Sequence, residues 1–247
     1  MTETVRIGND TAIVAYSGGK DSTATLLWAL DHYARVIPVF CDTKAEWPET
    51  YEYLDYVEQK LCLAIIRISG KWSGGLFEWV EHYRFWPTMW ARGCTTELKK
   101  QPMTRWLRGQ PPHDLLFGQR AEESAARALL PMQQGNLLRP VLRWSRVDVI
   151  NYIRSKGLKM NPVYAFVDRA NCCVCPLGKP SGIREFQRRY PMLLARWLQM
   201  ENQIGHSWRD SMTLRQAAQV EQGSLFETTD YSECLLDGLC DLGDGEK

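Results

Sequence analysis

The sequence has almost no excess of charge of either sign, because 30 lysines and arginines stand against 29 aspartates and glutamates in 247 residues. A net charge of +1 gives no general field for binding a nucleic acid or a membrane, so any basic surface must be local. The chain also lacks an apolar run long enough to span a bilayer, and its first residues lack the apolar stretch of a signal peptide. We therefore expect a cytoplasmic protein with no membrane partner.

Internal repeats and low-complexity segments are absent as well. A chain of this length with 45% hydrophobic residues is long enough for one large α/β domain with a small appendage. Eight cysteines could in principle pair, but Cys172, Cys173 and Cys175 crowd together. In a cytoplasmic α/β protein such crowding indicates metal or redox chemistry rather than structural disulfides.

An apolar segment at 12–16 leads into a glycine turn and then into a predicted helix at 23–30. The turn consists of Ser17, Gly18, Gly19, Lys20, Asp21 and Ser22. The two glycines let a bound group approach the main chain closely, and the amides at the helix start favour an anion. The serines add hydroxyl donors, the lysine adds a positive charge, and the aspartate can cap the helix or help to hold Mg²⁺. The glycine spacing is neither that of a Walker loop nor that of a dinucleotide fingerprint, yet phosphate is the natural ligand.

Apolar, β-branched runs at 34–41, 63–68 and 114–118 predict further buried parallel strands. Helices are expected at 49–61, 146–156, 183–190 and 192–203. Asp42 follows the second strand, at the sheet edge where open α/β folds bind ligands. The alternative is that Pro48 and Glu49 in the same stretch merely start a helix, and both interpretations can hold.

Gly118 ends the fourth predicted strand, and a group of polar residues follows it. We expect a helix on which Arg120, Glu123, Ser124 and Arg127 share one face by their spacing of three and four residues. Arginines there can grip phosphate or sulfate bidentately. The alternative is a solvated helix with intrahelical ion pairs.

Four tryptophans lie between residues 72 and 90, interleaved with basic residues. They could form stacking platforms for a base. Alternatively, Trp79 and its neighbours form the buried side of a short helix. Trp86 and Trp90 are the two that we expect at the border of a site.

Several motifs within residues 10–180 resemble the N-type ATP pyrophosphatase (PP-loop) superfamily, and within it the phosphoadenylylsulfate (PAPS) reductase-like branch. They are the loop at 17–22, Asp-Thr-Lys-x-Glu-x-Pro-Glu-Thr at 42–50, Cys-Thr-x-x-Leu-Lys-x-x-Pro at 94–102, Gly-x-Arg-x-x-Glu-Ser-x-x-Arg at 118–127, Asn-Pro-x-Tyr at 161–164 and Cys-x-x-Cys-Pro at 172–176. Lys44 stands where the family commonly has glycine. The resemblance implies a Rossmann-like α/β fold of the adenine nucleotide alpha hydrolase type. Such a fold has an open, mostly parallel sheet with helices on both faces, here with a helical C-terminal extension.

The resemblance also implies a set of site residues. Cofactor binding is expected at Ser17, Gly18, Gly19, Lys20, Asp21, Ser22, Asp42, Gly118, Arg120, Glu123, Ser124 and Arg127. Catalytic roles are expected for Lys20, Asp21, Arg120 and Cys173.

A metal is expected on Cys94, Cys172, Cys173 and Cys175, because a Cys-x-x-Cys turn presents two sulfurs to one metal. Cys94 adds a third thiol near a helix start, where the dipole favours thiolate. A [4Fe–4S] cluster on three of these cysteines would keep one iron open, an arrangement used by superfamily members that sulfurate nucleic acid. Zinc and a metal-free dithiol remain alternatives.

The leading functional hypothesis is an enzyme that cleaves Mg²⁺-bound ATP to AMP and pyrophosphate, adenylates a substrate and serves sulfur transfer to DNA or tRNA. It rests on the complete loop, which true PAPS reductases show in an altered form. The first alternative is a PAPS or adenylylsulfate reductase that uses a C-terminal cysteine, Cys234 or Cys240. The second alternative is a nucleotide-binding subunit without catalysis.

The expected partners are ATP or an adenylyl sulfonucleotide, a sulfur-donor protein or thiol reductant, a nucleic-acid acceptor and a second copy of the chain in a homodimer. We divide the chain into a nucleotide-binding domain with the cysteine cluster at 1–180 and a helical extension with an acidic tail at 181–247.

Overall fold

The computed structural model describes residues 5–88 and 90–219. A six-stranded sheet has the strand order β3-β2-β1-β4-β6-β5. The strands are β1 (Thr11–Tyr16), β2 (Arg35–Asp42), β3 (Ile66–Ser69), β4 (Asp114–Phe117), β5 (Gln133–Gln134) and β6 (Leu137–Leu138). Every neighbouring pair is parallel except β5 with β6. The predicted open, mostly parallel α/β sheet is confirmed.

The central strand β1 is apolar because both of its faces are covered. Ala12, Ile13 and Val14 are fully buried, and Ile13 belongs to a different apolar cluster from its two neighbours. The chain passes from β1 to β2 and β3 on one side, then crosses to β4 on the other side of β1. The order of an open sheet reverses at such a point, and ligands bind there, outside the carboxyl ends of the strands.

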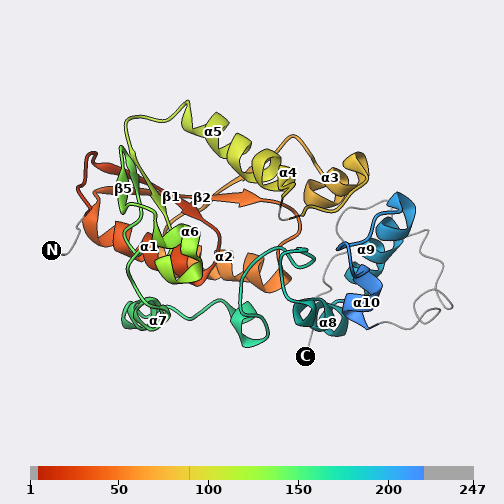
Figure 1. Cartoon of the computed structure of the whole chain (residues 1–247). Coiled ribbons are helices and arrows are strands. Elements are labelled where there is room, and N and C mark those ends of the chain that lie inside the picture. The colour runs from red at the N-terminus through yellow and green to blue at the C-terminus, as the bar shows by residue number, and fades with distance from the viewer. Residues whose placement is uncertain (1–4, 89, 220–247) are drawn as a thin grey trace.

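Helices cover both faces of the sheet (Figure 1). On one face, α1 (Lys20–His32), α2 (Pro48–Leu61) and α7 (Arg146–Ser155) share an apolar cluster with β1. On the other face, α5 (Gln101–Leu107) contributes Met103 to a cluster with Ile13 and Val39. The sheet is therefore the middle of three layers.

A third apolar cluster lies beside the sheet. It joins α3 (Gly75–Tyr83), α8 (Pro180–Arg189), α9 (Pro191–Ile204) and α10 (Leu214–Ala218) (Figure 1). The same cluster contains Val163 and Val174 from before the predicted boundary at 180 and Phe186 from after it. The C-terminal part is helical, as predicted, and it shares one core with the segment that precedes it.

Short helical segments connect these elements. They are α4 (Gly93–Thr95), the π-helix η1 (Thr96–Lys100), the 3₁₀ helices η2 (Ala121–Glu123) and η3 (Pro162–Ala165), and α6 (Ala125–Ala128). None of the helices within 5–88 and 90–219 is long and apolar enough to cross a membrane.

Some local predictions were wrong. The expected strand at 63–68 forms only from Ile66, and a short helix, α10, occupies part of the stretch expected to be a polar tail. Trp86 is fully buried in the third cluster rather than at the border of a site, whereas Trp90 is 93% exposed. Trp79 is also buried, which agrees with the alternative of a short helix with one apolar side.

Candidate functional site

The loop between β1 and α1 has the conformation that its glycines allow. Gly18 has a φ of +69°, in the left-handed region, and a Cβ there would lie 3.0 Å from Cγ2 of Thr50. Two serines close the loop across its base, because Oγ of Ser17 lies 3.0 Å from Oγ of Ser22. The Ser22 hydroxyl also donates to the carbonyl of Gly19 (2.9 Å). The loop is thus folded back on itself at the N-terminus of a 13-residue helix, where backbone amides favour an anion.

The end of β4 packs directly against this loop. A Cβ on Gly118 would lie 2.5 Å from the amide nitrogen of Ser22 and 2.6 Å from its Cα. No other residue fits there without moving the backbone. Gly118 therefore sets the distance between β4 and the start of α1.

Two residues of the segment before the cysteines hold the loop from its other side. Asn161 donates through Nδ2 to the carbonyl of Gly18 (3.0 Å), and the amide of Lys20 donates to the hydroxyl of Tyr164 (3.0 Å). Asn161 is 2% exposed. Their motif at 161–164 was visible in the sequence, but its spacing alone did not reveal that both side chains reach back about 140 residues to the loop.

A buried chain of charges adjoins the loop. The ammonium of Lys20 lies 2.7 Å from one carboxylate oxygen of Asp21, and Nε of Arg120 lies 2.5 Å from the other. Arg120 also contacts Glu122 through Nη1 (2.5 Å). Burial lowers the pKa of Lys20, and its contact with Asp21 opposes this effect. The structure therefore brings together three of the residues that the sequence singled out.

The segment after Gly118 differs from the predicted helix. Arg120 and Ser124 have extended backbones, so a 3₁₀ turn and a single helical turn replace one continuous helix. The expectation of four side chains on one helical face was wrong, because Arg120 turns inward to Asp21 instead. Glu123 still forms an ion pair with Arg127.

Positive charge gathers around Arg127. Burial lowers its pKa, and the nearby guanidinium groups of Arg169, Arg120 and Arg92 lower it further, against the opposing effect of Asp21. These arginines come from separate segments of the chain. Like charges that gather in this way favour a bound anion.

Asp42 lies at the end of β2, as predicted, and its carboxylate already has hydrogen-bond and ion-pair partners within the protein. It accepts from the amide of Lys44 and the hydroxyl of Tyr51, both at 2.8 Å, and pairs with the Lys44 ammonium at 2.8 Å. Lys44 has a φ of +56°, in the left-handed region that favours glycine. Asp42 holds this turn in shape, and its role in cofactor binding stays a prediction.

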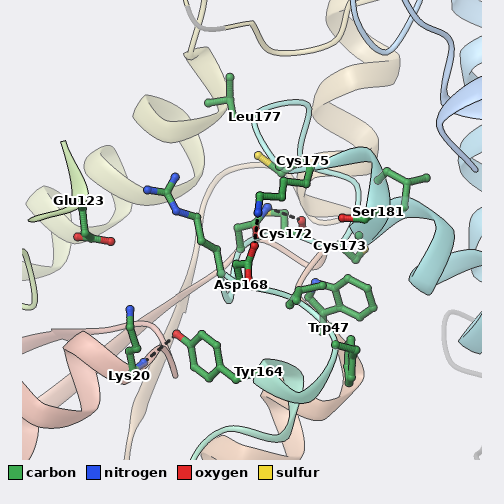
Figure 2. Close-up of a pocket in the computed structure, with 18 of the residues that line it drawn as sticks. Lys20, Trp47, Glu123, Tyr164, Asp168, Cys172, Cys173, Cys175, Leu177 and Ser181 are labelled. Carbon is green, nitrogen blue, oxygen red and sulfur yellow. Dashed lines mark hydrogen bonds and ion pairs between the residues drawn. The ribbon is translucent and has the colours of Figure 1, made fainter. Parts of the chain in front are cut away.

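One cavity of about 920 Å³ joins the loop to the cysteines (Figure 2). Lys20, Tyr164 and Glu123 lie on one side of it and the cysteine loop lies on the other. The residues that line the cavity are 20, 47, 120, 122, 123 and 146, together with most of 164–183. Segments that lie more than 150 residues apart in the sequence thus border a single space.

Cys172 and Cys175 border the far side of this cavity, and Cys94 lies close enough to Cys175 and Lys99 for their charges to act on it. Burial raises the pKa of Cys94 and Cys172, and a charge on Cys175 would raise both further. Glu46, Cys172 and Cys175 in turn raise the pKa of Lys99. The Lys99 ammonium opposes the effect of burial and acts to lower the pKa of both Cys94 and Cys172, and a bound metal ion would favour their thiolate forms further.

Cys173 differs from the other three cysteines. Its side chain is only 6% exposed and belongs to the third apolar cluster, and its amide donates to the carbonyl of Ala45 (2.8 Å). Within the described residues, no three Cys, His, Asp or Glu side chains are arranged to hold a metal ion. A metal on these four cysteines, whether an iron–sulfur cluster or zinc, therefore stays a prediction, and the burial of Cys173 in the apolar cluster sets it apart from the other three.

Fold and site together define an α/β protein with a nucleotide-binding type of fold and a glycine loop at its topological switch point. Residues 11–168 match the model of the phosphoadenosine phosphosulfate reductase domain. The chain belongs to this family, in the PAPS reductase-like branch of the PP-loop superfamily.

The chain is also similar to individual proteins. An uncharacterised 37.8 kDa protein of Escherichia phage 186 is 30% identical, over 78% of this chain and 75% of the phage protein. The phosphoadenosine 5'-phosphosulfate reductase of Salmonella typhi is 31% identical over 52% of this chain, and the match spans 55% of the reductase. Two uncharacterised proteins of Methanocaldococcus jannaschii are matched over 44% and 48% of their lengths. The crystal structure of the PAPS reductase of Candida auris gives a TM-score of 0.48 at 18% identity, covering 62% of this chain and 76% of that one.

Proposed function

We propose that this protein binds ATP in the loop at 17–22 and cleaves it between the α- and β-phosphates, adenylating a second substrate for sulfur transfer. The observation that carries the proposal is that the loop and the thiols of Cys172 and Cys175 border the same cavity. A nucleotide bound at the start of α1 and a sulfur held by the cysteine loop would then reach one another. The family supports an enzyme of this general type.

The chain's own groups suit the first step. Loop amides and Lys20 would stabilise the negative charge that develops on the departing pyrophosphate. Asp21 lies between Lys20 and Arg120 and pairs with both, which fixes its carboxylate beside two residues that line the cavity. Bound Mg²⁺, which a carboxylate such as Asp21 would help to hold, supplies charge neutralisation along the phosphates. Arg127 would orient an anionic part of either substrate.

The second step is a displacement that needs no oxidant. Hydrosulfide, as the sulfur source, attacks the adenylated carbon, a C–S bond forms, and the C–O bond breaks with its electron pair leaving on AMP. Cys94, Cys172 and Cys175 would hold a [4Fe–4S] cluster, which supplies an iron atom to which sulfide can bind. DNA and tRNA are the proposed acceptors.

A second candidate is a sulfonucleotide reductase. The similarity to reductases such as that of Salmonella typhi favours it, and Arg127 with Arg169 could bind a sulfate. Its nucleophile would be Cys234 or Cys240, and both lie outside the described residues. The third candidate, a nucleotide-binding subunit without catalysis, would keep the loop and lose both reactions.

One experiment separates the three candidates. The anaerobically purified full chain is incubated with Mg²⁺, ATP, hydrosulfide and either tRNA or DNA, and AMP and pyrophosphate are measured. A parallel reaction contains PAPS and dithiothreitol, and sulfite is measured. We expect pyrophosphate in the first reaction and no sulfite in the second. Sulfite without pyrophosphate would replace the proposal by the reductase, and ATP binding without either product would replace it by the binding subunit.

A matched pair of variants ties the activity to the loop. Gly118→Ala places a methyl group 2.5 Å from the Ser22 amide, whereas at Gly109 the nearest atom to a new Cβ is 3.9 Å away. We expect Gly118→Ala to lower pyrophosphate release at least about tenfold, since a misplaced catalytic group has an effect of this order. Gly109→Ala should retain the wild-type rate. Equal rates for the two variants would contradict the assignment of the site.

A further inference from the structure

The cysteine loop has an unusual set of backbone partners. The carbonyls of Val174, Pro176 and Gly178 all accept hydrogen bonds from two consecutive residues near the end of the described chain, Trp208 and Arg209. We propose that Trp208 and Arg209 are positioning residues that fix Cys172 and Cys175 at the wall of the cavity. The importance of this loop rests on the proposed function, but its position can be measured without any nucleotide.

The contacts flank the second cysteine of the Cys-x-x-Cys pair on both sides. Nε1 of Trp208 donates to Val174 at 2.8 Å, and Nε of Arg209 donates to Pro176 at 2.7 Å. Nη2 of Arg209 also donates to Gly178. Cys175 therefore lies between two residues whose carbonyls are hydrogen-bonded by different side chains, Val174 by Trp208 and Pro176 by Arg209.

The loop needs such partners because it has few of its own. Within it, the amide of Cys175 donates to Cys172 (3.1 Å) and the amide of Gly178 donates to Cys175 (2.9 Å), and Pro176 has no amide proton to give. The remaining carbonyls at 174, 176 and 178 would otherwise face water or stay unpaired. A rigid arginine fork matches two of them at once.

The two positioning residues are themselves firmly held. The carboxylate of Glu201, which is 6% exposed, accepts from the amides of Trp208 (2.6 Å) and Leu214 (2.8 Å). The Arg209 guanidinium lies 4.3 Å from the centroid of the Trp208 ring, and the Arg209 amide donates to Met212 (2.9 Å). The segment from α9 to α10 thus forms a fixed support beneath the cysteine loop.

This support lies in a part of the chain that the family model does not cover. The family model ends at residue 168, before the cysteine loop and before the residues that hold it. Trp208 is 1% exposed, whereas Arg209 is only partly buried and reaches the loop from outside the cavity. A side chain placed in this way can fix the sulfurs without touching a substrate.

The test measures iodoacetamide alkylation of the full chain after a chelator has removed iron and zinc anaerobically, so that no bound metal protects the thiols, and each cysteine is quantified by mass spectrometry. Losing a hydrogen bond worth about 1 kcal/mol raises the population of an open loop about fivefold. We therefore expect Arg209→Ala to raise the alkylation rates of Cys172 and Cys175 at least about fivefold, with exposed Cys62 unchanged as internal reference. Arg209→Lys should restore part of the difference, because an ammonium reaches one carbonyl rather than two.

Arg84→Ala is the matched control, since Arg84 also donates to a backbone carbonyl, that of Gln203 (2.8 Å), but makes no contact of this kind with the cysteine loop. A wild-type alkylation rate in Arg209→Ala, or an equal rise in Arg84→Ala, would overturn the proposal. If Arg209→Ala fails to fold, Trp208→Phe, which removes the Nε1 donor and keeps a smaller aromatic ring, must show the same selective rise. Absence of pyrophosphate release would affect the proposed function alone, because no readout here involves ATP.

Discussion

Arg120 links the phosphate loop to the rest of the site. Its side chain is 5% exposed, and its guanidinium contacts the carboxylates of Asp21 and Glu122. We predict that Arg120→Ala lowers the free energy of unfolding by about 3 kcal/mol, because it removes one of the two cations that pair with the buried carboxylate of Asp21. ATP binding should weaken as well.

Urea denaturation and ATP titration measure both effects of Arg120→Ala. Arg188→Ala serves as control, since Arg188 is exposed and pairs with Glu185 on the surface of α8. That control should leave both quantities unchanged. A variant at Arg120 with wild-type stability would contradict the buried ion pair.

Glu97 is a second residue whose charge the structure stabilises. Burial alone would raise the pKa of Glu97, but the ammonium of Lys71, the hydroxyl of Tyr83 and the indole N–H groups of Trp72 and Trp79 outweigh this and lower it to about 2. An unfolded glutamate has a pKa of about 4.3. The stabilisation is therefore fully present above that value and is lost as the pH falls toward 2.

Glu97→Gln should make the free energy of unfolding less dependent on pH in the acidic range. Between pH 5 and pH 3, at which the unfolded glutamate takes up its proton, the free energy of unfolding should fall less in the variant than in the wild type. Urea denaturation at several pH values measures this slope, and the difference between the two proteins isolates one carboxylate from all others. Parallel curves would show that Glu97 does not have the lowered pKa.

At the scale of elements, the turn after β2 depends on backbone conformation. Lys44 has a φ of +56° and Gly75, which packs on it, has a φ of +62°. A Cβ on Gly75 would lie 2.1 Å from the Thr43 carbonyl oxygen. We predict that Lys44→Gly keeps or raises stability, by up to about 1 kcal/mol, because glycine takes this conformation without strain.

A substitution at Gly75 tests the same turn from the side of α3. Gly75→Ala should destabilise the protein by about 2 kcal/mol or more, since the new methyl group meets backbone that cannot move freely. Urea midpoints of both variants compare the two effects. A stable Gly75→Ala protein would mean that α3 and the turn at 43–44 are not in contact.

The elements also show what sequence could predict. The strands β1 and β2 were predicted within a residue or so, because parallel strands buried on both faces appear as apolar runs. The segment 120–127 was mispredicted because its helical spacing says nothing of the inward turn of Arg120 toward Asp21, 99 residues away. The helix α10 was missed because its evidence is a short capping box, Thr213 with Gln216, in a polar region.

At the scale of the whole molecule, the candidate site is built from contacts that no local pattern contains. The sequence motifs predicted the loop and the cysteines separately, and the structure places them around one cavity. The hold of Asn161 and Tyr164 on the loop and that of Trp208 and Arg209 on the cysteines span long stretches of chain. Such contacts follow from the packing of the third apolar cluster.

The metal content of the whole protein distinguishes the cysteines. Cys172 lies near Cys175 and Lys99, whereas Cys173 packs in the core. We predict about four irons and four sulfides per chain after anaerobic purification, lost in Cys172→Ala and retained in Cys173→Ala. Iron, sulfide and zinc analysis with the absorption spectrum near 400 nm measures this. Stoichiometric zinc, or equal loss in both variants, would contradict the three-cysteine cluster.

The most direct test of the central claim is a competition titration. Mg²⁺-ATP and PAPS are titrated calorimetrically into the same anaerobic preparation of the full chain, each alone and each against the other. Because only ATP carries β- and γ-phosphates to fill the loop at 17–22, we predict that ATP binds at least about tenfold more tightly, or about 1.4 kcal/mol. Tighter binding of PAPS would contradict the account and identify the loop as a sulfonucleotide site.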